Sequence, residues 1–367
     1  MSSTPSGDAP DASDTHAAPA VDEEASLLEV EGLHTAFHTD RGTVTAVDGV
    51  DLALESGEIV GLVGESGSGK SVLARSIMGL VDDPGEIVGG DVRIRGESLV
   101  DADENRLNEL RGSTVSLVFQ DPMHSLNPTL SVGEQIAETV RLNQDVGESV
   151  SLSAEMKRKI LGAAENSEAW RRAIEMLEAV QIPEPAARAG DFPHEFSGGM
   201  RQRAMLAIAL SCEPDLLIAD EPTTALDVTI QAQILDELRD LKEEFDTTIL
   251  LITHNLAVVA ETCDRVNVMY AGEIVERAPT ETLFDAPSHP YTQGLIASTP
   301  RVDDPEADLQ PIPGSVPEGV GDQPPCKFAP RCPEAKAECY EQDPYFRDVG
   351  EDHEAACLRR GPEGERL

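Results

Sequence analysis

The sequence predicts an α/β fold built around a phosphate loop, and three observations support this. An apolar run at 59–63, Ile-Val-Gly-Leu-Val, is typical of a buried strand. It leads directly into Gly64–Ser71, Gly-Glu-Ser-Gly-Ser-Gly-Lys-Ser, which fits the pattern G-x-x-x-x-G-K-[ST], and a helix-like run follows at 71–78. Two further apolar runs, 216–219 and 248–253, end in polar residues, as parallel strands do where a sheet binds a ligand.

The residues of this loop suit a polyphosphate. Gly64, Gly67 and Gly69 let backbone N–H groups curl around phosphate oxygens. Lys70 adds a point charge towards the terminal phosphates, and the hydroxyl of Ser71 is a ligand for Mg²⁺. The helix that begins here adds the positive end of its dipole. We therefore predict that the loop, which also includes Glu65, Ser66 and Ser68, holds a nucleoside triphosphate with Mg²⁺.

Length and charge limit the other functions. The 367 residues are enough for a full-size nucleotide-binding domain and a smaller additional domain. The net charge of −41, from 69 acidic and 28 basic residues, argues against nucleic-acid binding, which needs a basic face. It fits a protein from a halophilic source, because a very salty cytoplasm screens self-repulsion. The sequence lacks a membrane span of about 18 apolar residues and a secretion signal, so we expect a cytoplasmic protein that meets a membrane only through a partner.

The N-terminal part contains a tail and then short strands. Residues 1–26 are mostly Ser, Thr, Ala, Pro and acids, which predicts a disordered acidic tail. The runs 28–37, 43–47 and 50–54 are typical of strands and predict an antiparallel sheet. Phe37 is the aromatic residue of this region, and it either stacks on an adenine ring or belongs to the core.

The middle of the chain contains further candidate site residues and a second Gly-containing turn. Gln120 follows a strand-like run at 115–119, so it either holds Mg²⁺ or a water, or is a turn residue. Residues 132–180 read as a helical insertion. Ser197-Gly198-Gly199 precede a helix at 201–210 and are either a second phosphate site or an ordinary N-cap turn.

Three further candidates follow buried strands. Asp220 and Glu221 come after the apolar run at 216–219, where Asp220 can hold Mg²⁺ and Glu221 can polarise a water; the alternative is a helix-capping pair. His254 follows the run at 248–253 and either touches a terminal phosphate or makes a structural hydrogen bond.

The order and spacing of these pieces resemble the ATP-binding subunit of ABC (ATP-binding-cassette) transporters, over residues 28–277. The signature is Phe-Ser-Gly-Gly-Met at 196–200, where Leu-Ser-Gly-Gly-Gln is commonest. The resemblance implies a RecA-like core with an antiparallel β subdomain and a helical subdomain at about 121–210, together spanning 27–285. A small Cys-rich extension, 286–367, follows. The other matching motifs are the phosphate loop, Gln120-Asp121-Pro122, 216–221, Ala225-Leu226-Asp227 and His254.

The resemblance also implies a role for each candidate. Glu221 would be the catalytic base or water-polariser, and His254 would contact the γ-phosphate. The signature 197–199 would close over ATP bound on a second cassette, with Asp227 at their interface. The remaining roles are adenine stacking by Phe37, phosphate binding by residues 64–70, and Mg²⁺ binding by Ser71, Gln120 and Asp220.

Three segments resemble the oligopeptide/dipeptide branch of ABC importers: 120–128, 289–296 and 312–314. This implies an ATPase that powers peptide import from the cytoplasmic face of the membrane. Its partners would be a second, different ATPase subunit, two transmembrane permease subunits and an extracellular substrate-binding protein. Nickel importers share much of this region, so nickel or another solute is an alternative cargo. A soluble, non-transport ABC ATPase is disfavoured because no sustained heptads separate the loop from the signature.

Four cysteines crowd the extension: Cys326, Cys332, Cys339 and Cys357, spaced C-x5-C-x6-C-x17-C. Disulfides are uncommon in a reducing cytoplasm, whereas a metal can replace a missing core. The spacing lacks the C-x2-C pairs of zinc ribbons, and Cys332-Pro333 is a step seen beside iron–sulfur clusters. The tail also resembles that of peptide-importer cassettes that carry a [4Fe–4S] cluster. We predict such a cluster, with zinc or free thiols as alternatives.

Overall fold

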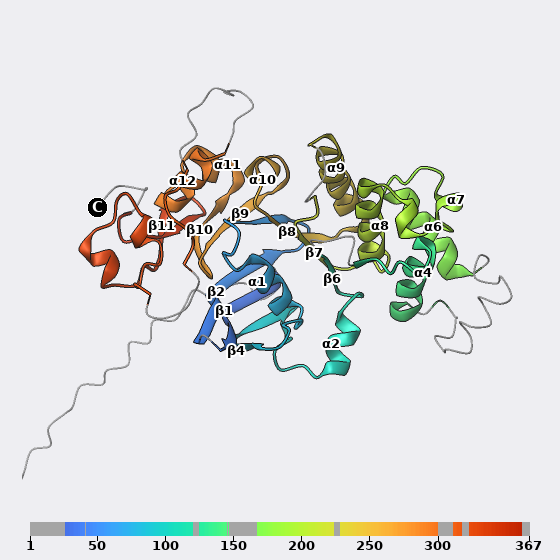
Figure 1. Cartoon of the computed structure of the whole chain (residues 1–367), viewed down its shortest axis with the longest axis horizontal. Helices are drawn as coiled ribbons and strands as arrows, with labels where there is room; N and C mark the ends of the chain where they lie inside the picture. Colours follow the sequence, from blue (N-terminus) through green and yellow to red (C-terminus); the bar gives the residue numbers. More distant parts are fainter. Residues whose placement is uncertain are drawn as a thin grey trace, which may run out of the picture.

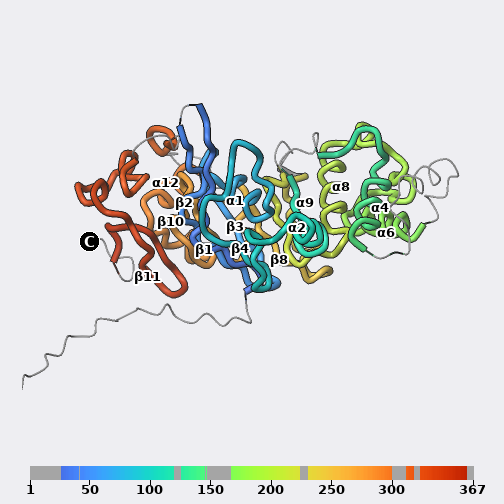
Figure 2. The backbone as a smooth tube through the Cα atoms, turned by 90° about the horizontal axis from the view of Figure 1, so that it is seen from below, coloured from blue at the N-terminus to red at the C-terminus, as the bar shows by residue number. Residues whose placement is uncertain are grey.

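The computed structural model describes residues 26–40, 42–119, 125–144, 146, 167–223, 228–299, 311–317 and 323–361. In these residues two β-sheets lie in the middle of the molecule, a group of helices lies at one end, and the C-terminal segment lies at the other (Figure 1). The same order along the long axis is visible after a quarter turn (Figure 2).

The larger sheet positions the polar residues at one edge. Within the described residues its strand order is β11-β12-β10-β9-β3-β8-β7-β6, and β9, β3, β8, β7 and β6 run parallel. Every residue of β3, β7 and β8 is buried, because helices cover parallel strands on both faces. The bounds are β3 Ile59–Val63, β6 Val115–Val118, β7 Leu216–Asp220, β8 Thr248–Thr253, β9 Arg265–Tyr270, β10 Glu273–Pro279, β11 Phe346–Gly350 and β12 His353–Ala356.

The smaller sheet is antiparallel, with the order β2-β1-β4-β5. Its two long strands are β1 (Ser26–Thr39) and β2 (Gly42–Glu55), so the runs 43–47 and 50–54 form one strand rather than the two we expected. The register between β1 and β2 shifts beside Gly49, whose φ of 67° lets the strand continue through a bulge. The other strands are β4 Gly85–Ile94 and β5 Glu97–Ser98.

The helices fall into two groups. Those at the far end, α4, α6, α7 and α8, fall within the predicted helical subdomain at about 121–210 (Figure 1). Serine side chains cap three of them: Ser131, Ser167 and Ser197 each accept a hydrogen bond from a backbone N–H in the first turn. The helix bounds are α1 Lys70–Ile77, α2 Glu104–Leu110, α4 Val132–Asn143, α6 Glu168–Ala179, α7 Pro185–Arg188, α8 Gly198–Leu210, α9 Val228–Phe245, α10 Leu256–Thr262, α11 Thr280–Asp285 and α12 Pro290–Ala297, with 3₁₀ turns η2 Pro193–Glu195, η3 Ala329–Arg331 and η4 Ala337–Tyr340.

The C-terminal segment shares the core of the protein. Strand β12 pairs with β10, and β11 pairs with β12, so the extension lengthens the larger sheet. Tyr270 of β9 packs against Tyr291 of α12 and Phe328, with ring centroids 4.7 and 5.2 Å away. The fully buried Glu276 accepts hydrogen bonds from the backbone N–H of His289 at 2.9 Å and from His353 at 2.7 Å. These buried contacts fix the extension against the sheet.

The predicted α/β fold, with a parallel core sheet, an antiparallel sheet and a helical region, is confirmed. Among the described residues, none of the helices has the length and apolar character needed to cross a membrane.

Candidate nucleotide site

The phosphate loop joins β3 to α1, and its conformation depends on glycine. Gly69 caps α1 with a φ of 105°, in the left-handed region that favours glycine. A Cβ atom on Gly69 would lie 2.3 Å from the backbone oxygen of Ala46 in β2. The glycine therefore lets the loop pass close to β2. Because no side chain caps α1, its first N–H groups are available to bind an anion.

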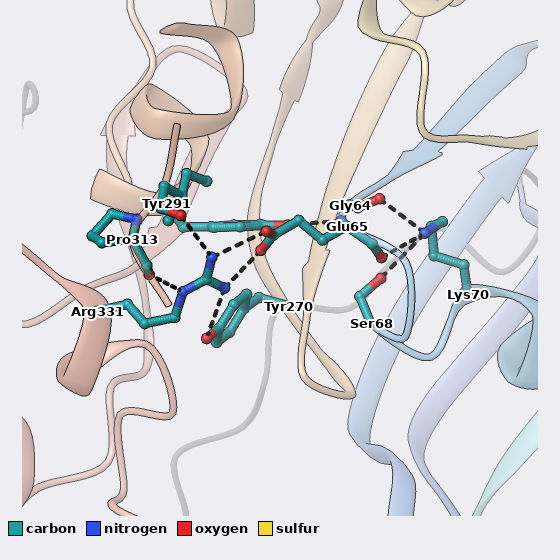
Figure 3. Close-up of polar contacts among 9 residues, drawn as sticks. Gly64, Glu65, Ser68, Lys70, Tyr270, Tyr291, Pro313 and Arg331 are labelled. Atoms are coloured by element: carbon teal, nitrogen blue, oxygen red, sulfur yellow. Dashed lines mark hydrogen bonds and ion pairs between the residues drawn. The ribbon is translucent and has the colours of Figure 1, made fainter. Parts of the chain in front are cut away.

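Lys70 is held inside the loop. Its Nζ donates hydrogen bonds to the carbonyl oxygens of Gly64 and Glu65, at 2.9 and 3.0 Å, and to the hydroxyl of Ser68 at 3.3 Å (Figure 3). Burial lowers the pKa of the Lys70 amine, and neighbouring carboxylates oppose that shift. The ammonium group lies beside the loop backbone, where it can reach phosphate oxygens.

Ser71 and Asp220 meet at the carboxyl edge of the sheet. The Ser71 hydroxyl donates to Oδ1 of Asp220 at 3.2 Å. Asp220 ends β7 and is buried, which raises the pKa of its carboxyl, whereas the Ser71 hydrogen bond lowers it. One hydroxyl and one carboxylate side by side fit the oxygen ligands that Mg²⁺ prefers.

Glu221 and His254 form a second pair beside them. Oε1 of Glu221 lies 3.0 Å from Nδ1 of His254, and the backbone N–H of Glu221 donates to Ile252 in β8 at 2.8 Å. The Glu221 side chain is 15% exposed and that of His254 61%. Glu221 also has a φ of 49°, in the left-handed region. For a residue other than glycine this conformation costs on the order of 1–3 kcal/mol of folding free energy, and such residues cluster at functional sites.

A cavity of about 350 Å³ brings these elements together. Lys70, Ser71 and Glu221 line it, so the structure joins the phosphate loop to the water-polarising candidate. Residues that sequence reasoning did not single out complete the wall. They are Val44, Thr45 and Ala46 of β2, Val72 of α1, Ala271, Gly272 and Pro317.

Phe37 does not line this cavity. Its ring packs over Gly85, since a Cβ built there would lie 2.5 Å from Cε1 of Phe37. Phe37 is nevertheless paired with Val44, which does line the cavity. The ring therefore lies on a strand that borders the cavity, packed against the neighbouring strand.

Other predicted residues lie elsewhere. Ser197 and Gly198 are exposed at the start of α8, and neither they nor Gly199 line the cavity. Helix α8 lies in the helical group, away from α1 (Figure 1). Gln120 and Asp227 fall outside the described residues. Within this one chain, the signature turn and the phosphate loop are not brought together.

Comparisons with known proteins agree with this geometry. A family model for ABC transporters matches residues 47–224, and a model for the oligopeptide/dipeptide transporter C-terminal region matches 275–339. The chain is 48% identical over 321 residues to the oligopeptide transport ATP-binding protein AppD of Bacillus subtilis, covering 87% of this chain and 92% of that protein. This chain belongs to the ATP-binding subunits of ABC transporters. It is also 46% identical over 335 residues to the oligopeptide transport ATP-binding protein OppD of Mycobacterium tuberculosis, covering 91% of this chain and 52% of that protein.

A solved structure supports the same assignment. The ATP-binding cassette MJ0796, in a dimeric post-hydrolysis state bound to ADP and Pi, matches with a TM-score of 0.58 and 26% identity. The match covers 69% of this chain and 98% of that one. The predicted family and ABC-type fold are confirmed, and the chain is an ABC-type ATPase.

The C-terminal extension of this cassette contacts the phosphate loop. The sequence analysis did not predict this contact. Arg331 forms an ion pair with Glu65, and the hydroxyl of Tyr291 accepts a hydrogen bond from the backbone N–H of Glu65 (Figure 3). Tyr291 belongs to the motif at 289–296, which the sequence analysis singled out for its resemblance to the importer branch. The motif did not indicate that Tyr291 contacts the phosphate loop. Nothing in the sequence distinguished Arg331.

The four cysteines of the extension all lie within the described residues. All four are free; burial raises the pKa of Cys326 to about 11, and the neighbouring Cys339 and Cys357 push it in the same direction. Burial also raises the pKa of Cys332 and of Cys357. Across the described part of the chain, no three His, Cys, Asp or Glu side chains form a group that could hold a metal ion. The geometry therefore does not support the predicted iron–sulfur site.

Proposed function

We propose that this chain hydrolyses ATP to power the import of di- or oligopeptides. The observation that carries the ATPase part is the meeting of Lys70, Ser71 and Glu221 around one cavity, with Asp220 hydrogen-bonded to Ser71. The peptide part rests on the match of residues 275–339 to the oligopeptide/dipeptide transporter C-terminal region and on relatives named for oligopeptide transport.

In this proposal each polar group has one task. Ser71, Asp220 and Gln120 would hold Mg²⁺, which would supply positive charge to neutralise the phosphates. Glu221 orients and polarises the attacking water, and the 3.0 Å contact with His254 supports this by fixing the carboxylate beside a residue that reaches the γ-phosphate. The backbone N–H groups at the start of α1 and the ammonium of Lys70 bind the phosphates, so chemistry here is mainly positioning and electrostatics.

The proposed active unit contains a second ATPase subunit. The exposed Ser197 and Gly198, which lie apart from the chain's own cavity, support a role in covering ATP on a partner, with Asp227 at the interface. In the peptide-importer branch that partner is a different cassette, and we propose the same here. Two membrane permeases would hold the pair at the cytoplasmic face, and an external binding protein would deliver the peptide.

Glu221→Gln tests the catalytic assignment. Because the amide cannot polarise water as a carboxylate does, we expect turnover to fall about 100-fold or more while ATP binding stays within about twofold. Steady-state phosphate release and titration with a fluorescent ATP analogue measure the two quantities. A matched control is Glu261→Gln, at an exposed position of α10, which should hydrolyse ATP like the wild type. Near-normal turnover in Glu221→Gln would remove Glu221 from the mechanism.

Uptake by a deletion strain separates the cargo alternatives. We expect labelled peptide uptake to require the wild-type gene and to be lost with Glu221→Gln, while nickel uptake is unchanged. The reverse pattern would favour the nickel alternative over peptides.

We also propose a [4Fe–4S] cluster on the four cysteines. One observation supports it: the backbone N–H of Cys326 donates to the carbonyl oxygen of Cys339 at 3.3 Å, which brings these two cysteines together. Against it stands the lack, in the described residues, of any group of three side chains that could hold a metal ion. Iron and acid-labile sulfide assays on anaerobically purified protein test this proposal, and we expect both iron and sulfide to be present. Stoichiometric zinc, or neither metal, would overturn the cluster.

We propose a halophilic origin from the charge of −41. Raising KCl from about 0.1 M to about 1 M shortens the Debye length from about 10 to about 3 Å and weakens repulsion between surface carboxylates. The midpoint of thermal unfolding should therefore rise with KCl. A midpoint that falls would contradict the proposal.

A further inference from the structure

A buried arginine of the extension forms an ion pair with one residue of the phosphate loop. Arg331, at the end of η3, donates from Nη1 to Oε2 of Glu65 at 2.7 Å and from Nη2 to Oε1 at 3.0 Å (Figure 3). The Arg331 side chain is 6% exposed and that of Glu65 29%. Two parallel hydrogen bonds between a guanidinium and a carboxylate fix direction as well as distance.

Arg331 is itself held in place by the extension and the sheet. Its Nε donates to the carbonyl oxygen of Pro313 at 2.7 Å, and its guanidinium lies 5.7 Å from the ring centroid of Tyr270. The Glu65 carboxylate raises the pKa of Arg331, so the side chain stays charged. The fork of Arg331 is thus oriented before it meets Glu65, which lowers the entropy cost of the contact.

A second contact from the extension holds the backbone of the same loop residue. The N–H of Glu65 donates to the hydroxyl of the buried Tyr291 at 2.8 Å. On the other side, the carbonyl oxygen of Glu65 accepts from Lys70 at 3.0 Å. Glu65 therefore links the extension to the lysine that faces the phosphates.

The extension also forms part of the cavity. Pro317, four residues after the Pro313 carbonyl that orients Arg331, lines it. Lys327 donates to the carbonyl oxygen of Ala271, another lining residue, at 3.0 Å. These contacts are independent of the Arg331–Glu65 pair and place the extension along the same wall.

We propose that Arg331 is a positioning residue for ATP binding, which acts through Glu65 to hold the phosphate loop in the conformation that receives the nucleotide. A loop fixed beforehand loses less conformational entropy when its ligand binds, so the pair should strengthen ATP binding. Arg331 lies on the far side of Glu65 from Lys70 and touches no reacting group (Figure 3). Its loss should therefore affect the KM for ATP and leave kcat nearly unchanged.

A double-mutant cycle on the full-length chain tests this. We expect Arg331→Gln and Glu65→Gln each to raise the KM for ATP, and the Kd for a fluorescent Mg²⁺–ATP analogue, about fivefold to tenfold, with kcat within about twofold. The double variant should be no worse than either single one, because all three break the same link. Arg331→Lys should lie between, since it keeps the charge but loses the paired hydrogen bonds.

The control breaks another contact between the extension and the sheet. Arg277 of β10 pairs with Glu354 of β12, away from the loop, at 2.5 Å. Glu354→Gln should lower the midpoint of thermal unfolding without changing the KM for ATP. If Glu354→Gln raises the KM as much as Arg331→Gln does, the effect is general loosening and the proposal fails.

The remaining outcomes are equally decisive. An unchanged KM in Arg331→Gln, or additive effects in the double variant, would overturn the proposal. If Arg331→Gln does not fold, Glu65→Gln carries the test, because it removes the same pair at a partly exposed position. The inference rests on ATP binding at this loop, so a wild-type chain that binds no ATP would refute the proposed function instead.

Discussion

Two turns of this cassette use the same local chemistry in opposite surroundings. Both are Gly/Ser turns at the N-terminus of a helix: Gly69 caps α1 and Ser197 caps α8. The phosphate loop contacts β2, the sheet and the extension; Ser68 and Lys70 are buried in it, whereas Ser66 and Gly67 are exposed. In the signature turn Ser197 and Gly198 are exposed, and the hydroxyl of Ser197 accepts a hydrogen bond from the backbone N–H of Met200 in the first turn.

This difference shows what completes each turn. Contacts from three parts of the chain fix the phosphate loop in advance. The signature turn offers exposed N–H and hydroxyl groups, which fits a surface that another chain completes. Glycine substitutions in the two turns separate these roles, because the added methyl group meets different neighbours.

Gly69→Ala should have the larger effect. The methyl group would meet a backbone oxygen of β2 at 2.3 Å, and a φ of 105° disfavours any side chain. We expect ATP binding to weaken about 100-fold or more and stability to fall by about 2–4 kcal/mol. Titration with the fluorescent nucleotide and thermal unfolding measure both. Wild-type affinity would mean that the loop does not need this close approach to β2.

Gly199→Ala should have the smaller effect on the isolated chain. Its methyl group would meet one side-chain atom, Cγ2 of Ile230, at 2.9 Å, rather than the backbone oxygen that a methyl group on Gly69 meets. We expect nucleotide affinity to stay within about twofold and stability to fall by about 1 kcal/mol, whereas turnover in the assembled transporter falls at least about tenfold. Unchanged turnover would contradict the role of the signature turn at a partner's ATP.

Local patterns predicted most of the fold and part of the site. The apolar runs before Gly64 and Asp220 are buried strands, as expected, because alternation of strand and helix leaves such runs covered on both faces. The meeting of Ser71 with Asp220 also followed from the topology, since parallel strands bring their carboxyl ends to one edge. The prediction of two strands at 43–47 and 50–54 was wrong, because a bulge at Gly49 allows β2 to continue as one strand.

The sequence by itself determined the chemistry of the loop: a short segment contains the glycines, the lysine and the magnesium-binding hydroxyl, and their spacing alone fixes what they can bind. Only the tertiary structure decided what holds that loop. Glu65 and Arg331 are separated by most of the chain, and their contact exists because β12 extends the sheet and the aromatic side chains around Tyr270 anchor α12 and η3 beside β9. Such a pairing depends on long-range packing, which local spacing and composition do not encode.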